Sequence, residues 1–263
     1  MPECRITWYC PDMLNLHGDR GNLMALTRIA GIVGLEPKLH RIDDRKDPVP
    51  WEETDILFFN PGEVRTVAYL ADALGRQREQ LRRYVEEDGV LVAIGTSGAA
   101  FGNRMRRLSG EEFEGLGILD MECREREGIL GDDIVIRIPE SGMELSGIQI
   151  QLIDAEVAEQ AVLGEVLYGY GNQGYEHGCE GARYRNVFYT NLLGPVLVRN
   201  PWWGEELIRL AMRRRGIPVP EDLPEDRYAL EQKSHACVRS YCLDDYQRTK
   251  SHNPWNKTDR HGQ

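Results

Sequence analysis

The chain has 263 residues, 41% of them hydrophobic, and a formal net charge of -11. This composition predicts a globular protein, and one domain followed by a tail is the simplest interpretation of an α/β chain of this length. The acidic balance argues against general nucleic-acid binding, because phosphate contacts depend on clustered Lys and Arg. No apolar run approaches the roughly 20 residues of a membrane span, and no secretion signal opens the chain. We therefore expect a cytoplasmic protein without a membrane span.

The first half of the chain alternates short apolar runs with amphipathic segments. The predicted strands are 5–9, 38–42, 55–59 and 90–94, and the predicted helices are 22–33 and 67–87. Parallel strands need crossover connections, which the helices would supply. This order predicts an α/β fold with a mostly parallel sheet and helices on both faces.

The second half is richer in predicted strands. These are 133–138, 145–152, 162–168 and 185–189, followed by a helix over 205–215. The basic run 213–215 is interpreted as the last turn of that helix, which Gly216 would cap. The chain becomes polar after Pro218, so we predict one domain over 1–220 and a partly flexible extension over 221–263.

The chain contains histidines and cysteines that could bind a metal ion, but their spacing does not favour a metal site. His177, Cys179, His235, Cys237 and Cys242 do not form paired Cys-x-x-Cys units, and the six cysteines of the chain are scattered. We expect reduced thiols, no metal and no cofactor.

The adjacent pair Trp202 and Trp203 allows two interpretations. The rings could pack in the core at the start of a helix, or they could anchor an interface with another protein. Neighbouring positions on one helix cannot both face inward, so both possibilities stay open.

The segment 89–102 reads as a strand that runs into a glycine-rich turn. Its sequence is GVLVAIGTSGAAFG, the layout of a nucleophile elbow without a cysteine. Of the polar residues in the turn, only Thr96 and Ser97 carry a hydroxyl group.

Four ordered segments carry a family resemblance. They are Leu14–Asn22, Glu114–Asp120, Gly169–Asn172 and Leu192–Leu197. In this order they resemble the cobyric-acid-synthase-like class of glutamine amidotransferases, and within it the GatD-like subunits that work with a Mur-ligase-like (MurT-like) partner on lipid II. The resemblance covers roughly residues 5–220. It implies a class I amidotransferase core, a cysteine nucleophile with a histidine base, and transfer of ammonia to the partner.

The chain differs from this family at the positions of the nucleophile, the base and the oxyanion loop. The family cysteine falls at Gly95, Thr96 or Ser97, and the family histidine falls at Leu193. The glycine-rich oxyanion loop corresponds to Asn60, Pro61 and Gly62, where a proline cannot donate an N–H. A further family arginine falls near Gly128 or Ile129.

Two functional hypotheses follow from this pattern. The favoured one is a non-catalytic subunit that scaffolds or regulates a Mur-ligase-like enzyme, which would then use free ammonia, another amine or an amino acid in place of glutamine-derived ammonia. The alternative is an active glutamine-hydrolysing subunit, in lipid II or cobyric-acid-type amidation, that uses Ser97 or a residue of its partner. The motif Leu14–Asn22 could be retained as a structural turn or as part of the partner-binding face, and the sequence leaves both open.

Overall fold

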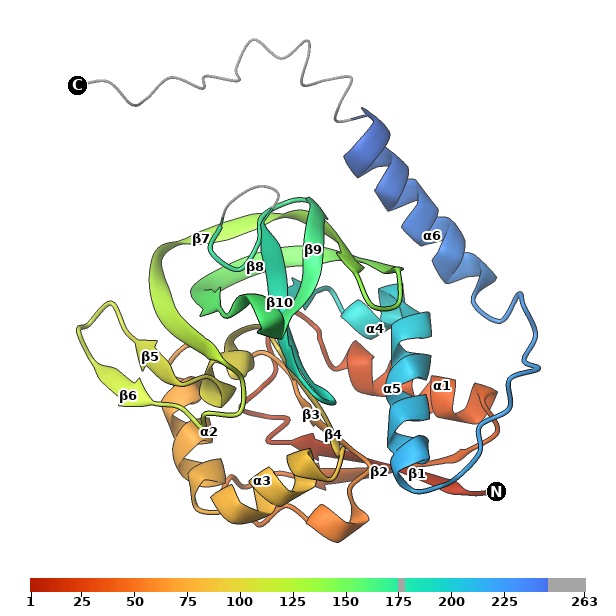
Figure 1. Ribbon diagram of the computed structural model, residues 1–263, viewed down its shortest axis with the longest axis horizontal. Coiled ribbons are helices and arrows are strands. Elements are labelled where there is room, and N and C mark those ends of the chain that lie inside the picture. Colours follow the sequence, from red (N-terminus) through yellow and green to blue (C-terminus); the bar gives the residue numbers. More distant parts are fainter. Residues whose placement is uncertain (175–177, 246–263) are drawn as a thin grey trace.

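A computed structural model describes residues 1–174 and 178–245, in which one sheet connects most of the chain (Figure 1). Its strands are β1 (Glu3–Tyr9), β2 (Glu36–Ile42), β3 (Ile56–Phe59), β4 (Val90–Ile94), β5 (Arg104–Arg106), β6 (Glu112–Glu114), β7 (Met121–Ile138), β8 (Met143–Val157), β9 (Val162–Tyr168), β10 (Cys179–Tyr184), β11 (Val187–Thr190) and β12 (Leu192–Leu193). The order across the sheet is β12-β8-β7-β9-β10-β11-β4-β3-β1-β2, with β5 and β6 beside β7.

The parallel part of the sheet consists of β2, β1, β3, β4 and β11. Every residue of β3 and β4 is buried. Side chains alternate between the faces of a strand, so Ile56 and Phe58 pack in one apolar cluster while Leu57 and Phe59 pack in another. Burial on both faces explains these uninterrupted apolar runs and confirms the predicted α/β class.

Helices cover both faces of this parallel core. The helices of the described chain are α1 (Gly21–Ile32), α2 (Thr66–Gly75), α3 (Arg78–Glu86), α4 (Val196–Arg199), α5 (Pro201–Arg214) and α6 (Ala229–Ser240), of which α6 contacts β8 rather than the parallel core. Short helical turns occur at η1 (Trp51–Glu53), η2 (Gly95–Phe101), η3 (Glu159–Ala161) and η4 (Tyr241–Asp245). The helices α1 and α5 share one apolar cluster with the sheet, and α2 and α3 share the other (Figure 1).

The single helix predicted over 67–87 is wrong, because the chain forms two helices that separate at Gln77. The Gln77 backbone leaves the helical region, with φ -117°. Its side-chain oxygen accepts hydrogen bonds from Val49 N (2.9 Å) and Trp51 Nε1 (3.1 Å). The apolar spacing continues across the break, so periodicity alone could not reveal this tertiary contact.

The predicted strand 185–189 has a different place from the one expected. It is observed as β11, which pairs in parallel with β4 and so belongs to the parallel core. The antiparallel part of the sheet is formed by β7, β8, β9 and β10, and its main feature is the long β7–β8 hairpin (Figure 1).

The two adjacent tryptophans at the start of α5 divide between core and surface. Trp203 is 2% exposed and meets Phe188 edge to face. Trp202 is half-buried, donates from Nε1 to the Glu144 carbonyl (3.1 Å), and packs against the ring of His235. The core interpretation therefore holds for Trp203, and α6 covers part of Trp202.

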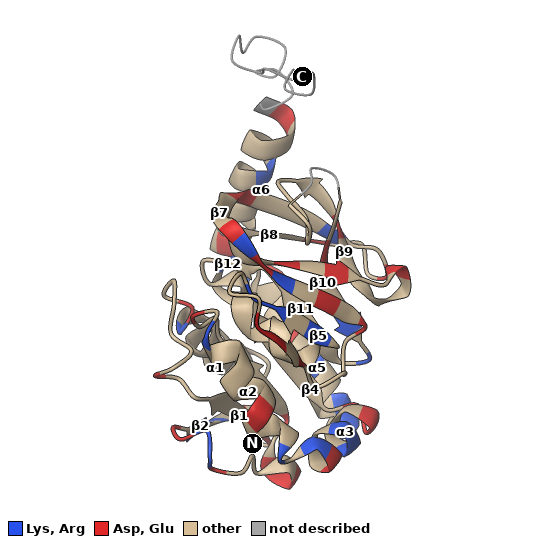
Figure 2. Cartoon of the chain, turned by 90° about the vertical axis from the view of Figure 1, so that its left-hand side faces the viewer, with Lys and Arg blue, Asp and Glu red and all other residues tan. Residues whose placement is uncertain are grey.

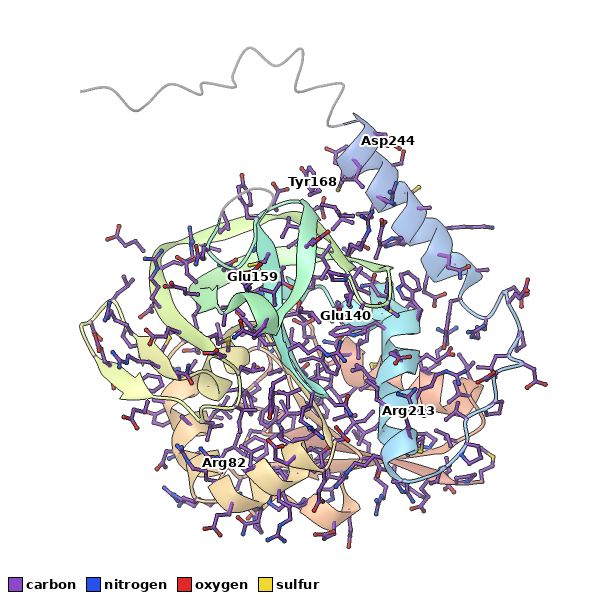
Figure 3. All side chains as sticks on the ribbon, viewed as in Figure 1. Arg82, Glu140, Glu159, Tyr168, Arg213 and Asp244 are labelled. Atoms are coloured by element: carbon purple, nitrogen blue, oxygen red, sulfur yellow. The ribbon has the colours of Figure 1, made fainter. Side chains whose placement is uncertain are left out.

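The basic run is the end of α5, as predicted. Arg213 lies on the last turn of this helix (Figure 3), and Gly216 follows with φ +67°. Arg215 pairs with the buried Asp55 (2.9 Å) and Arg214 with Glu87 (3.4 Å). Two of the three arginines in this run therefore form ion pairs with other parts of the chain.

Residues after the predicted boundary at 220 contact the rest of the chain. In α6, Glu231 pairs with Arg28 (2.8 Å), His235 Nδ1 lies 3.0 Å from Ser146 Oγ, and Arg239 pairs with Glu144 (2.6 Å). The division into 1–220 and 221–263 stays a prediction, and 246–263 lie outside the described residues. Within the described chain, no helix is both long and apolar enough to cross a bilayer.

Candidate functional site

Gly95 occupies the tip of the strand-to-helix turn. It directly follows β4, opens η2, and has φ +60°. A positive φ at the first residue after a buried strand is the strained geometry of a nucleophile elbow. Of the three positions that the sequence left open for the nucleophile, Gly95 is the one at the tip.

Three separately predicted positions converge around this tip. A Cβ atom placed on Gly95 would lie 3.1 Å from Cβ of Pro61 and 3.4 Å from Cδ2 of Leu193. Pro61 and Leu193 are both buried. The space where a side chain at position 95 would begin is therefore bounded by a proline ring and an aliphatic side chain, and neither can transfer a proton.

Thr96 ties the elbow to the loop that follows β3. Its Oγ1 accepts a hydrogen bond from Gly62 N (3.1 Å) and donates one to the Gly62 carbonyl. Proline at 61 has no N–H, and the next amide is already engaged by this hydroxyl. No free amide of Pro61 or Gly62 remains to stabilise an oxyanion.

Ser97 points into the protein interior. The residue is fully buried, and its Oγ donates to the Ile94 carbonyl (2.9 Å). A second carbonyl, from Phe59, lies 3.4 Å from the same hydroxyl. Ser97 therefore closes the turn rather than facing the elbow tip.

The neighbouring Asn60 is buried and used structurally. With its amide oriented to satisfy both neighbours, the nitrogen donates to the Asp19 carbonyl (3.0 Å) and the oxygen accepts from Trp8 Nε1 (3.3 Å). Asn60 thus links the loop after β3 to the segment Leu14–Asn22.

The segment Leu14–Asn22 contacts the residues that directly follow Leu193. The Asn22 side-chain oxygen accepts from Leu197 N (2.9 Å), and Gly194 N donates to the Asp19 carboxylate. A Cβ on Gly21 would come within 2.5 Å of Pro195 Cγ, so only glycine permits this approach. These contacts supply the structural role that the sequence offered for the motif, and its role in binding a partner stays a prediction.

Asp19 is fully buried, and its Oδ2 has no hydrogen-bond partner within the described residues. Burial raises the pKa of this carboxyl to about 7, although hydrogen bonds from Gly194 and Asn22 oppose the shift. A raised folded-state pKa means that the carboxyl favours folding fully below about pH 4, and that this contribution is lost as the pH rises through about 7.

The variant Asp19→Asn is therefore expected to gain stability relative to the natural chain as the pH rises from 5 to 8. The relative gain should reach roughly 3 kcal/mol, because one pKa unit corresponds to about 1.4 kcal/mol. Urea unfolding at pH 5 and pH 8 measures it, with the exposed Asp47→Asn as the control. Parallel pH profiles for natural chain and Asp19→Asn would contradict the assignment.

The position expected for a further family arginine lies on an irregular part of β7. The pairing with β8 shifts between Glu125 and Leu130, and Ile129 is 68% exposed. The nearby Arg126 is instead ion-paired with Asp154, a nearly buried residue. The register shift changes which residues of β7 face inward, and the place of the family arginine stays a prediction.

The histidines and cysteines that the sequence offered as soft ligands do not assemble within the described residues. Among the described residues, no three His, Cys, Asp or Glu side chains converge as metal ligands. His177 lies outside those residues. The six cysteines are free thiols.

Relatives are recognised over nearly the whole chain, although no protein-family model matches it. The chain is 30% identical over 227 residues to "Lipid II isoglutaminyl synthase (glutamine-hydrolyzing) subunit GatD" of Staphylococcus aureus (strain N315), covering 86% of this chain and 92% of that protein. The chain belongs to the GatD family. The subunit of the same name from Streptococcus pneumoniae (strain ATCC BAA-255 / R6) is 28% identical over 227 residues, covering 84% of this chain and 86% of that protein.

The fold agrees with GatD-family membership. A solved structure described as "Crystal structure of glutamine amidotransferase" superposes with a TM-score of 0.53 at 18% identity, covering 78% of this chain and 98% of that one. At this identity the similarity concerns the fold alone. It confirms the predicted class I glutamine-amidotransferase-like core.

Proposed function

We propose that this GatD-family chain is a pseudo-glutaminase, a non-catalytic subunit of a Mur-ligase-like (MurT-like) amide-forming enzyme in cell-wall biogenesis. The observation that carries the proposal is the elbow tip, where a Cβ atom placed on Gly95 would meet Pro61 and Leu193. Glutamine hydrolysis needs a thiolate, a base and oxyanion donors. Gly95, Pro61 and Leu193 supply neither a thiol nor a base, and Pro61 has no N–H to donate.

The hydroxyl groups of the turn do not replace the thiol. The Ser97 hydroxyl is buried and bonded to the Ile94 carbonyl, and the Thr96 hydroxyl is bonded to Gly62. An alcohol becomes a nucleophile only when an adjacent base removes its proton. Neither hydroxyl has a hydrogen bond to such a base.

The subunit role rests on the relatives. Both GatD relatives are named as subunits of a lipid II isoglutaminyl synthase that hydrolyses glutamine. This chain retains their fold and the contacts of the segment Leu14–Asn22 with Gly194 and Leu197. We infer that it keeps the scaffold that binds the synthetase while the nitrogen arrives as free ammonia or another amine.

A glutaminase assay tests this proposal directly. The purified chain, alone and with a Mur-ligase-like partner, is expected to release no glutamate from glutamine above the buffer rate. Ser97→Ala should leave that result unchanged, because the hydroxyl faces the interior. In the complex, product amide formed from ¹⁵N-ammonium and not from amide-¹⁵N-glutamine would agree with the proposal. Glutamate release that Ser97→Ala abolishes would overturn it.

A further inference from the structure

The strands β5, β7 and β8 present a charged face that the elbow does not use. The register places Arg104, Glu122 and Glu156 in one row and Arg106, Arg124 and Asp154 in the next. We call these six residues the outer face. Alternating basic and acidic residues along β7 are visible in Figure 2.

The sheet itself separates the outer face from the elbow. The intervening residues Met105, Cys123 and Ala155 are buried in the apolar cluster that also contains Phe101 of η2. Successive side chains of a strand point to opposite faces. The outer face therefore lies on the side of the sheet turned away from that cluster and from η2.

A hollow of about 330 Å³ lies over the outer face and is lined by all six of its residues together with Cys123 and Gln173. Its floor is the nearly buried Asp154. The Asp154 carboxylate is held by Arg124, Arg126 and the Gln151 side chain, so the floor is fixed in place. Such a hollow is large enough for a molecule of several heavy atoms.

The charged side chains of the second row all form ion pairs. Arg124 Nε lies 3.2 Å from Asp154 Oδ2, and Arg106 Nε lies 2.6 Å from Oε1 of Glu112 on β6. These two pairs leave no unmatched charge in the row.

The first row is not neutralised. Arg104, Glu122 and Glu156 form no ion pair with any residue that the structure describes, although Glu114 on β6 is also in register with Arg104. Glu122 lies directly opposite Glu156. Like charges opposite each other in a sheet are unfavourable, and a cation between them would relieve the repulsion.

We propose that this hollow binds a small zwitterion, with its carboxylate at Arg104 and its primary ammonium between Glu122 and Glu156. Strands in a sheet lie about 4.8 Å apart, so the two charges of the ligand would be separated by roughly 5–8 Å. An ω-amino acid or a lysine-like molecule has this spacing. The site is independent of the proposed function, because it lies on the other side of the sheet from η2.

Isothermal titration of the full chain with 6-aminohexanoate tests the site. Hexanoate and hexylamine, which each carry one of the two charges, are the matched comparison ligands. At low ionic strength the zwitterion is expected to bind saturably and at least about fivefold more tightly than either. Added salt should weaken it.

Variants then assign the two ends of the ligand. Glu122→Gln/Glu156→Gln is expected to weaken 6-aminohexanoate about tenfold, and Arg104→Gln should reduce its affinity to that of hexylamine. The exposed Glu159→Gln on η3 (Figure 3) is the control and should bind as the natural chain does. Absence of saturable binding, equal binding of hexylamine, or no effect of these outer-face variants would overturn the proposal. Thermal unfolding of each variant confirms that it is folded.

Discussion

The triple variant Gly95→Cys/Leu193→His/Pro61→Gly is expected to hydrolyse glutamine at least about a hundredfold above the buffer rate, the level expected of the natural chain. The three positions meet at the elbow tip, so a thiol and an imidazole placed there would start within contact distance of each other. A neighbouring imidazole promotes thiolate formation. Glycine at 61 would restore a backbone N–H that proline lacks.

The three substitutions should act together rather than singly. Gly95→Cys alone would bring a Cβ to 3.1 Å from Pro61 Cβ at a backbone with φ +60°, which is tight and strained for a residue with a side chain. Pro61→Gly removes that contact as well as adding the donor. We therefore expect each single variant to remain close to the buffer rate.

Glutamate release under initial-rate conditions, with and without a Mur-ligase-like partner, measures the gain. The matched control is Gly95→Ala/Leu193→His/Pro61→Gly, which carries the same strain and the same Cβ without a thiol. Equal rates for the cysteine and alanine triples would contradict the view that these three positions separate this chain from a working glutaminase.

Gly98→Ala is expected to lower the free energy of unfolding by about 3 kcal/mol. A Cβ at this position would lie 2.0 Å from Cδ2 and 2.4 Å from Cε2 of Tyr189. The Tyr189 ring is 1% exposed on β11, so it cannot swing into solvent. The turn after β4 and the strand β11 would have to move apart.

Denaturant unfolding measures this loss, and Gly31→Ala on α1 is the control. A Cβ at Gly31 would meet nothing within 4 Å. Alanine is the better helix former, so this control should be more stable by about 0.5–1 kcal/mol. In a Tyr189→Leu background, Gly98→Ala should cost clearly less. An equal cost in both backgrounds would show that the Tyr189 ring is not the obstacle.

The alternation of apolar runs with amphipathic segments was sufficient to predict the parallel core. The runs in β3 and β4 are buried on both faces, which is why they contain no polar residue. The spacing of apolar residues did not predict the end of a helix where a side chain bonds to residues far away in the sequence. Gln77 ended one helix by bonding to Val49 and Trp51, which are remote in the sequence.

Motif order predicted the positions of the candidate site but not its geometry, and the catalytic meaning of these positions stays a prediction. Motif order placed the departures at 60–62, 95–97 and 193, and all of these lie at or beside one turn. The choice among Gly95, Thr96 and Ser97 depended on a backbone dihedral angle and on the direction of one hydroxyl group. The residue types alone do not determine this dihedral angle or this hydroxyl direction, because glycine and serine each fit several turn conformations.

Residue order alone identified the fold class and the GatD-like resemblance, and it predicts that the chain lacks the catalytic cysteine and histidine of that family. Only the tertiary structure decided that Pro61 and Leu193 border the space that a side chain at position 95 would enter, and that Arg104, Glu122 and Glu156 share a hollow. The spacing of apolar residues in the sequence indicates which face of a single helix or strand is buried. Contacts between residues far apart in the chain follow from strand register and packing, which exist only once the chain has folded.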